Sequence, residues 1–292
     1  MRSDLAVLGL GTMGGRVAAL AVREGLTVVG YDPVAAARER AREQEIEVSQ
    51  DAALAAASAD TILISVPRPE HVAALASGPL LDAAPGSVVV DISTIDPGTA
   101  QQAAAALAER GVFYIDAPVL GRPDRCGAWT LVAGGSEAVV DSVTPLLVKT
   151  VATRVVRVGD VGAGSVVKLL NNLMFGAINA VTAEVLTLAR DHGLDPSVFV
   201  DAVATSGAAT VSNLFKEIAP RMISGDDEPM FALALLAKDN RLALELALTS
   251  GTAAPIAQAV DRINTAAVEQ GLADRDTGAV HQAYPRLPKV HQ

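Results

Sequence analysis

The chain carries, at residues 162–172, the sequence Gly162-Ala163-Gly164-Ser165-Val166-Val167-Lys168-Leu169-Leu170-Asn171-Asn172. This stretch opens the longest apolar run of the chain, which continues to about residue 190. At 1.5 Å per residue the run predicts a helix roughly 40 Å long, which is enough to join two domains. Its apolar residues fall on several faces, so we expect this helix to be buried all round.

Two polar residues inside this apolar segment are candidates for chemistry. Lys168 and Asn172 are four residues apart, so their side chains share one face of the helix. A lysine in a desolvated site has a lowered pKa and can exchange a proton near neutral pH. The alternative is that Lys168 extends its head group to solvent beside an asparagine. From this segment alone, both interpretations remain open.

Composition and charge limit the class of protein. With 292 residues, the chain is long enough for two ordinary domains with their own cores. Its hydrophobic content of 50% argues against extended disorder. The formal net charge of −10 provides no basic surface for nucleic acid or for an anionic membrane. The single cysteine, Cys126, cannot form an internal disulfide, which suits a reducing cytoplasm.

Neither a targeting segment nor a membrane span is expected. The apolar run 5–8 near the N-terminus is too short for a signal sequence. No window contains about 18 uncharged apolar residues. The polar residues that interrupt the long central helix are Lys168, Asn171, Asn172, Asn179 and Glu184. We therefore expect a cytoplasmic protein without a membrane contact.

The N-terminal residues predict a dinucleotide site. Residues 5–8 and 26–31 are typical of buried strands, and between them lie the loop Gly9-Leu10-Gly11-Thr12-Met13-Gly14 and a helix with an apolar face. Gly9 permits the tight turn, Gly11 lets the backbone approach a pyrophosphate, and Gly14 allows close packing of helix and strand. The alternative, an ordinary glycine turn, does not explain the acid that follows the second strand.

That acid, Asp32, favours NAD over NADP. Its carboxylate can accept a hydrogen bond from the ribose 2′-hydroxyl and would repel a 2′-phosphate. Arg38 and Arg40 follow on a helix rich in alanine. We interpret them as part of a solvated face, although they leave room for NADP.

Three further strands, at residues 61–66, 87–92 and 112–115, continue the α/β alternation. Ligands bind at the carboxyl ends of such strands, so the loops after Val66, Ile92 and Ile115 form the candidate site. Asp96 and Pro97 predict the N-cap and first turn of the helix between the last two of these strands.

The rest of the chain changes from α/β to helical character. After a loop rich in turn residues at 117–127, we expect a strand at 129–133, a helix at 137–147 capped by Ser136, and a strand at 153–158. Beyond these, the helical period dominates and strand signals stop. The sequence therefore predicts a dinucleotide-binding Rossmann domain at residues 1–162 and an all-helical substrate and oligomerisation domain at residues 163–292. Interfaces between such domains are favoured places for small-ligand pockets.

These motifs together resemble the β-hydroxyacid dehydrogenase family, which includes 3-hydroxyisobutyrate dehydrogenase. The resemblance covers nearly the whole chain in the family's order. The segments that carry it are residues 9–14, 91–97, 116–119, 164–172 and 238–239. It implies an α/β Rossmann domain followed by an all-α domain joined by a long interdomain helix. It also implies NAD(P)-dependent interconversion of a small 3-hydroxy acid and its aldehyde or ketone, by a homodimer or homotetramer.

The resemblance further implies roles for individual residues. Lys168 is the general acid/base, and Asn172 helps to hold the substrate. Ser93 and the loop amides around Gly121 bind the substrate carboxylate. The residues assigned to the cofactor are Gly9, Gly11, Thr12, Met13, Gly14, Asp32, Val66, Pro67, Thr94 and Lys238.

The second substrate loop departs from the family pattern. Where the family usually has Ser-Gly-Gly, this chain has Leu120-Gly121-Arg122, and the loop is about two residues shorter before Gly127. The planar guanidinium of Arg122 can replace the missing serine, because it binds a carboxylate, sulfonate or phosphate well. The alternative is a surface arginine beside Asp124. We therefore expect a small hydroxy acid whose acid group is a carboxylate or a sulfonate.

Two other functions share this architecture. An imine reductase or reductive aminase generally has aspartate, tyrosine or another residue in place of the catalytic lysine, so Lys168 argues against it. A non-enzymatic dinucleotide-binding protein would also be expected to have lost that lysine. No metal is expected, because the four histidines have no metal-ligand spacing. These are His71, His192, His281 and His291.

Overall fold

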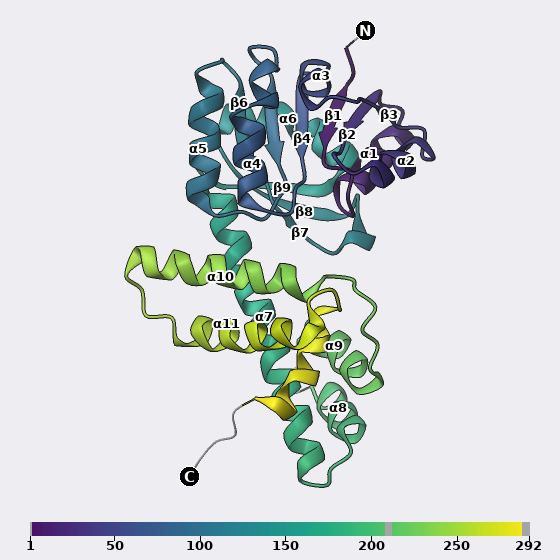
Figure 1. The fold of residues 1–292 in the computed structure, drawn as a ribbon, viewed down its shortest axis with the longest axis vertical. Helices are drawn as coiled ribbons and strands as arrows, with labels where there is room; N and C mark the ends of the chain where they lie inside the picture. The colour runs from purple at the N-terminus through teal and green to yellow at the C-terminus, as the bar shows by residue number, and fades with distance from the viewer. Residues whose placement is uncertain (1, 208–211, 288–292) are drawn as a thin grey trace. The chain divides into compact units, whose positions relative to one another are not determined.

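The computed structural model describes residues 2–207 and 212–287 of the chain. The chain divides into two compact units, which meet between Lys168 and Leu169. This boundary lies inside the helix α7 (Ala163–Asp191), whereas the sequence places it where the helix begins. In Figure 1 the N-terminal unit runs from purple to teal and the C-terminal unit from teal to yellow.

The N-terminal unit is built on one sheet with strand order β3-β2-β1-β4-β5-β6-β8-β7, and β9 pairs with β8. The strands are β1 (Leu5–Leu8), β2 (Val28–Tyr31), β3 (Glu47–Val48), β4 (Thr61–Ile64), β5 (Val88–Asp91), β6 (Phe113–Asp116), β7 (Val119–Leu120), β8 (Trp129–Gly134) and β9 (Ala152–Gly159). The strands from β3 to β6 are parallel, and β8 is antiparallel to β6 and β7. Ala6 of β1 pairs with Val29 of β2 on one side and Ile62 of β4 on the other. The chain therefore reverses its direction of winding at β1, where Rossmann sheets bind ligands.

Helices cover both faces of this sheet. They are α1 (Gly14–Arg23), α2 (Ala35–Arg42), α3 (Ala52–Ala57), α4 (Pro69–Ala76), α5 (Pro97–Ala108) and α6 (Glu137–Thr150). Leu5 and Val7 pack with α1, α2 and α6, whereas Ala6 and Leu8 pack with α3, α4 and α5. Figure 1 shows α4 and α5 in front of the sheet and α6 behind it. This doubly wound arrangement confirms the expected Rossmann domain.

Local details differ from the sequence-based expectations. The β4 strand ends at Ile64, and the segment expected to be an irregular loop contains β7 and a short 3-10 helix (Pro123–Arg125). Asp96 caps α5 as expected, because its carboxylate accepts a hydrogen bond from the Thr99 amide at 2.8 Å. Ser136 is the N-cap residue of α6 as expected, but its side chain makes no capping hydrogen bond.

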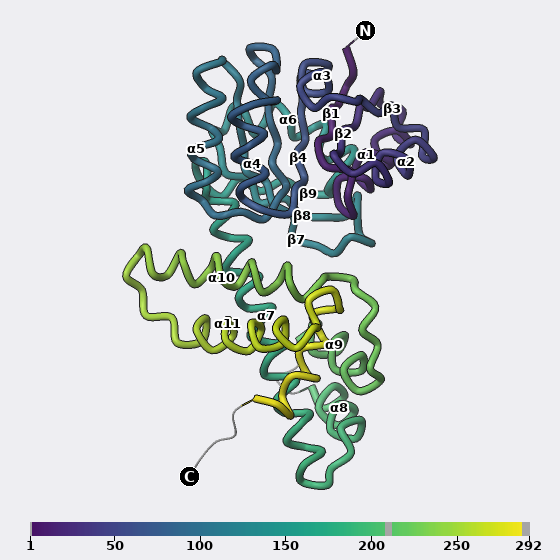
Figure 2. The backbone as a smooth tube through the Cα atoms, in the orientation of Figure 1, coloured from purple at the N-terminus to yellow at the C-terminus, as the bar shows by residue number. Residues whose placement is uncertain are grey.

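The C-terminal unit is helical, as predicted. After α7 come α8 (Pro196–Thr205), α9 (Asn213–Ser224), α10 (Leu233–Ser250), α11 (Pro255–Ala267), a π-helical turn (Val268–Leu272) and a 3-10 helix (Thr277–Arg286). Asp195 caps α8 through a hydrogen bond from the Ser197 amide at 2.8 Å. Figure 2 shows α10 and α11 side by side. The helices pack around a core that includes Ala183, Phe215 and Leu233.

The expectation that α7 is buried all round is wrong. One stripe of the helix is exposed although its side chains are large and apolar. The stripe consists of Leu170, Met174, Val181 and Leu188. By length and composition alone, α7 is apolar enough to cross a membrane, a test that the core helix of a soluble protein also passes. Its buried face includes the polar residues Asn172, Asn179 and Thr182.

Candidate active site

The glycine loop between β1 and α1 has the shape that a pyrophosphate site requires. Gly9 has a φ of +96°, and a Cβ atom there would lie 2.1 Å from the carbonyl oxygen of Ser65. A Cβ at Gly14 would lie 2.0 Å from the carbonyl oxygen of Gly9. A Cβ at Gly11 would meet nothing within 4 Å. The loop is therefore closely packed on the protein side and open at Gly11, which fits a bound pyrophosphate.

Asp32 lies directly after β2, and its buried carboxylate holds the glycine loop. One oxygen accepts a hydrogen bond from the Leu10 amide and the other from the Val34 amide, both at 2.8 Å. Arg38 donates to the main-chain oxygen of Asp32 at 2.5 Å. The carboxylate thus lies at the end of β2 beside the loop, as a ribose-binding acid does.

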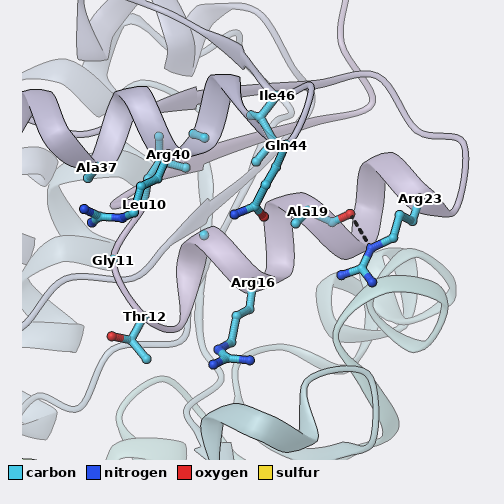
Figure 3. A pocket seen from close by; sticks show the side chains of 12 residues that line it. Leu10, Gly11, Thr12, Arg16, Ala19, Arg23, Ala37, Arg40, Gln44 and Ile46 are labelled. Atoms are coloured by element: carbon cyan, nitrogen blue, oxygen red, sulfur yellow. Dashed lines mark hydrogen bonds between the residues drawn. The ribbon is translucent and has the colours of Figure 1, made fainter.

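A groove of about 550 Å³ begins at this loop and runs between α1 and α2. Figure 3 shows Gly11 and Thr12 at one end of the groove, Arg40 on the α2 side, and Arg16 and Arg23 on the α1 side. Among the described residues, these three arginines have no carboxylate partner within 4 Å. The chain as a whole is acidic, so these arginines form a locally basic rim. A basic rim attracts phosphate groups, and the groove is therefore compatible with NADP as well as with NAD.

The carboxyl end of β5 brings Ser93 to Val66. Asp91, the last residue of β5, is completely buried, and it accepts hydrogen bonds from the Ser93 amide at 2.8 Å and the Tyr114 hydroxyl at 2.6 Å. The Ser93 hydroxyl accepts from the Val66 amide at 2.9 Å. Pro67 and Thr94 follow in the same two loops. Val66 and Ser93, which are assigned to different ligands, are therefore joined by a direct hydrogen bond, and Asp91 holds the Ser93 backbone.

Burial raises the pKa of Asp91 from its ordinary value of 3.8 to about 6, although its hydrogen bonds from Tyr114 and Ser93 act in the opposite direction. In the folded protein Asp91 therefore keeps its proton up to about pH 6, whereas the unfolded chain releases it near pH 3.8. Between these values the folded state binds more protons than the unfolded state. The stabilising contribution of Asp91 is thus present below about pH 3.8 and is lost as the pH rises to about 6.

Asp91→Asn is expected to flatten the pH dependence of stability across this window. Asparagine is close in shape and does not titrate, so the loss of stability that accompanies deprotonation disappears. A difference of about two pKa units corresponds to about 3 kcal/mol in the free energy of unfolding. Urea unfolding of both proteins between pH 4 and 7 measures the change.

Tyr114→Phe is the matched variant, because it removes a hydrogen bond that lowers the pKa of Asp91. In this variant the loss of stability should extend to a higher pH than in the wild-type protein. An Asp91→Asn protein with the wild-type slope would contradict the assignment of this titration to Asp91.

The loop that is expected to bind the substrate packs on a buried tryptophan. A Cβ at Gly121 would lie 2.4 Å from the Trp129 ring, so only glycine fits there. The Trp129 ring nitrogen donates to the main-chain oxygen of Arg122 at 2.6 Å. The Arg122 side chain is 35% exposed and lies 3.8 Å from Asp124, which is a long ion pair. The loop backbone is thus fixed, while the Arg122 side chain lies partly in solvent.

Lys168 contacts this same loop. Its Nζ atom donates a hydrogen bond to the main-chain oxygen of Val119 at 2.7 Å, although the two residues are far apart in the sequence. Val119 lies in β7, two residues before Gly121. The lysine is therefore directed toward the end of the sheet at which the substrate loop begins.

In the C-terminal unit, a buried carboxylate links Asn172 and Lys238. The Asn172 amide nitrogen donates to Asp239 at 2.6 Å, and Lys238 lies 2.8 Å from the other oxygen of Asp239. The Asn172 side-chain oxygen accepts from Asn171 at 3.1 Å. Two more residues with expected roles are thus brought together, here by an aspartate without an assigned role.

Sequence reasoning gave no role to three aspartates, each of which binds a residue of the expected site motifs inside its own unit. Asp91 and Asp116 are the last residues of buried strands, and Asp239 lies on α10. A carboxylate at the carboxyl end of an apolar strand is a usable signal, because such a group is buried and needs hydrogen-bond donors. For Asp239 the signal is weaker, since an acid within a helix is usually exposed.

Neither a reactive thiol nor a metal-binding group is found among the described residues. Burial raises the pKa of the Cys126 thiol to about 11, so it stays protonated at neutral pH and is a poor nucleophile. Within residues 2–207 and 212–287, no three histidine, cysteine, aspartate or glutamate side chains form a group that could hold a metal ion.

Comparison with known proteins identifies the family. Residues 4–159 match the NAD-binding domain of 6-phosphogluconate dehydrogenase, and residues 162–284 match the NAD-binding domain of NADP-dependent 3-hydroxyisobutyrate dehydrogenase. The chain is 31% identical to 2-(hydroxymethyl)glutarate dehydrogenase of Eubacterium barkeri, over 97% of this chain and 95% of the relative. It is 30% identical to the NAD-dependent L-serine dehydrogenase of Pseudomonas aeruginosa, over 96% and 97% of the two chains.

A solved structure agrees with these relatives. The 3-hydroxyisobutyrate dehydrogenase of Salmonella typhimurium superimposes with a TM-score of 0.85 and 31% identity, over 96% of this chain and 99% of that one. The relatives are named as dehydrogenases, and the glycine loop with Asp32 fits the nicotinamide dinucleotide of the matched NAD-binding domain. The chain therefore belongs to the β-hydroxyacid dehydrogenase family and is an NAD(P)-dependent oxidoreductase that acts on CH–OH groups.

Proposed function

We propose that this enzyme interconverts a small 3-hydroxy acid and the corresponding aldehyde or ketone, with Lys168 as the general acid/base. The observation that carries the proposal is the hydrogen bond from Lys168 to Val119, which holds an amine at the start of the substrate loop. When bound, the dinucleotide supplies the acceptor or donor of the hydride. Gly9, Gly11 and Gly14 shape its loop, and Asp32 favours NAD, which is also the cofactor named for the serine dehydrogenase relative.

The proposed chemistry needs a proton acceptor and an oriented amide. In the oxidation, neutral Lys168 accepts the proton of the substrate hydroxyl, and in the reduction its ammonium returns a proton to the forming alkoxide. Asp239 can only accept hydrogen bonds when ionised, so the NH2 group of Asn172 must face it. The carbonyl oxygen of Asn172 accepts from Asn171, and its second lone pair can accept from a substrate hydroxyl.

The names of the relatives support a 3-hydroxy acid. 2-(Hydroxymethyl)glutarate, L-serine and 3-hydroxyisobutyrate each have a hydroxyl on the carbon next to the one that bears a carboxylate. For this chain we propose that Ser93, the amides around Gly121 and the guanidinium of Arg122 recognise the acid group. The guanidinium makes a sulfonate a second acceptable group, since both anions match its planar donors. Leu120 makes the adjoining wall apolar.

We also propose that the enzyme is a cytoplasmic homodimer or homotetramer. The apolar stripe of α7 supports assembly, since four large side chains repeat at helical spacing on an exposed face. Analytical ultracentrifugation tests this proposal, and a monomer at micromolar concentration would contradict it.

The experiment that tests the function is NADH formation at mildly alkaline pH across a panel of 3-hydroxy acids. The panel contains 3-hydroxyisobutyrate, L-serine, glycerate and sulfonated analogues, with NADP in place of NAD as a second arm. Turnover with one acid establishes the reaction and its substrate class. A preference for a sulfonate or a bulky acid would support the roles of Arg122 and Leu120. If no acid is oxidised, but NAD(P)H is consumed with a cyclic imine, the enzyme is an imine reductase instead.

A further inference from the structure

Asp116 connects the carboxyl end of β6 to the first turn of α7. One oxygen of its carboxylate accepts from the Gly162 amide and the other from the Ser165 amide, both at 2.7 Å. The first amides of a helix have no partner within the helix, and a carboxylate there is also favoured by the helix dipole. Asp116 is 1% exposed, so these hydrogen bonds lie outside solvent. The cap of α7 thus comes from a distant strand and not from the preceding residue.

The packing around this cap leaves no room for an added side-chain atom at two glycines. A Cβ atom at Gly164 would lie 2.3 Å from the main-chain oxygen of Val132 and 2.6 Å from that of Asp116. A Cβ at Gly134 would lie 2.4 Å from the Asp116 carboxylate. The first turn of α7 is therefore seated directly on the ends of β6 and β8, and its position depends on the atoms of Asp116.

The same segment also fixes the head group of Lys168. Lys168 follows Ser165 by one helical turn, and Val119, whose oxygen accepts from Nζ, follows Asp116 by three residues. Residues 116–119 therefore hold α7 at two points, the amides of its first turn and the amine of its lysine. A shift of the first turn would move the lysine relative to the substrate loop.

Asp116 also lies against the strand that positions Ser93. It pairs in register with Asp91 of β5, and the Ala117 amide donates to the main-chain oxygen of Asp91 at 2.7 Å. Asp91 in turn binds the Ser93 amide. Hydrogen bonds therefore connect the first turn of α7, through Asp116 and Asp91, to Ser93, which is expected to bind the acid group of the substrate.

We propose that Asp116 is a positioning residue of the dehydrogenase reaction, whose carboxylate sets the place of the first turn of α7 and so brings Lys168 to the substrate. The inference rests on the proposed role of Lys168. Asp116 itself exchanges no proton with the substrate. Its loss should therefore act on the rate of the chemical step and not on the affinity for the dinucleotide.

The experiment compares Asp116→Asn with Asp51→Ala, since both capping amides of Asp51 donate to one oxygen that asparagine would retain. In Asp116→Asn, asparagine keeps the size of the side chain but presents an NH2 group to one of the two donor amides. Asp51 is the matched control, because its carboxylate caps α3 through the amides of Ala53 and Leu54 and has no contact with α7 or the substrate loop. Both variants are assayed for kcat, for substrate KM and for the Kd of NAD, and their amide hydrogen exchange is measured by NMR.

Asp116→Asn is expected to lower kcat by about ten- to a hundredfold, since a misplacement of about 1 Å can cost that much. The Kd of NAD should stay within about twofold, and exchange at Gly162 and Ser165 should accelerate. Asp51→Ala, which removes the acceptor of both amides, should accelerate exchange at Ala53 and Leu54 without lowering kcat. Wild-type kcat in Asp116→Asn, or an equal loss in both variants, would overturn the inference. A wild-type enzyme without turnover on any hydroxy acid would instead refute the proposed function, and the inference with it.

Discussion

Lys168→Met is expected to lower kcat by about a hundred- to ten-thousandfold, the range that general acid–base catalysis supplies. Methionine fills a similar space with a flexible apolar chain, but it cannot accept or donate a proton. The Kd of NAD should change little, because Lys168 donates a hydrogen bond to Val119 at the start of the expected substrate loop, whereas the pyrophosphate is expected to bind at the glycine loop. Steady-state kinetics with the acid found in the panel, together with calorimetric titration of NAD, measures both quantities.

The control for this variant is Lys149→Met, the same substitution at an exposed lysine in the last turn of α6. It should retain wild-type kcat. Lys168→Met also leaves the Val119 oxygen without its donor, at a cost of about 1–3 kcal/mol in stability, so the assays are made well below the unfolding temperature. Turnover of Lys168→Met within about threefold of the wild-type value would exclude this lysine as the general acid/base.

Much of the fold follows from local sequence patterns. The short apolar runs, the glycine loop and the capping residue Asp96 depend on neighbours within a few residues. The sequence therefore predicts the strands other than β3 and β7, the turn before α1 and the start of α5. The prediction for α7 was right in length and wrong in burial. Which face of a helix is covered depends on where the other helices pack, and α9 had no clear signal of its own.

In the candidate site, too, local patterns predict some residues and the tertiary fold determines the others. Lys168 and Asn172 are recognisable because a helical period relates them, and Asp32 because it ends a strand at a fixed distance from the glycines. The contacts of Asp116 with Ser165 and of Asp239 with Asn172 join residues that are 49 and 67 positions apart. A single sequence does not reveal such pairs, because the tertiary fold alone determines them.

Two glycines of one motif are expected to respond differently to the same substitution, one by a loss of stability and the other by a loss of NAD affinity. Gly14→Ala places a methyl group 2.0 Å from the Gly9 oxygen and 3.1 Å from the Ser65 Cβ, so α1 must move away from β1. Overpacking of this kind costs about 1–3 kcal/mol, and here the opposing atoms belong partly to the backbone. Thermal unfolding of Gly14→Ala should therefore show a clearly lower Tm.

Gly11→Ala should leave Tm close to the wild-type value, because a Cβ there meets no atom within 4 Å and Gly11 does not have a positive φ. The added methyl group projects from the backbone that a pyrophosphate approaches, so the Kd of NAD should rise about tenfold or more, which is about 1.4 kcal/mol or more. Differential scanning fluorimetry without and with NAD separates the two effects. Unchanged NAD affinity in Gly11→Ala would show that the open space at Gly11 is not the pyrophosphate site, because a methyl group cannot share that space with a phosphate.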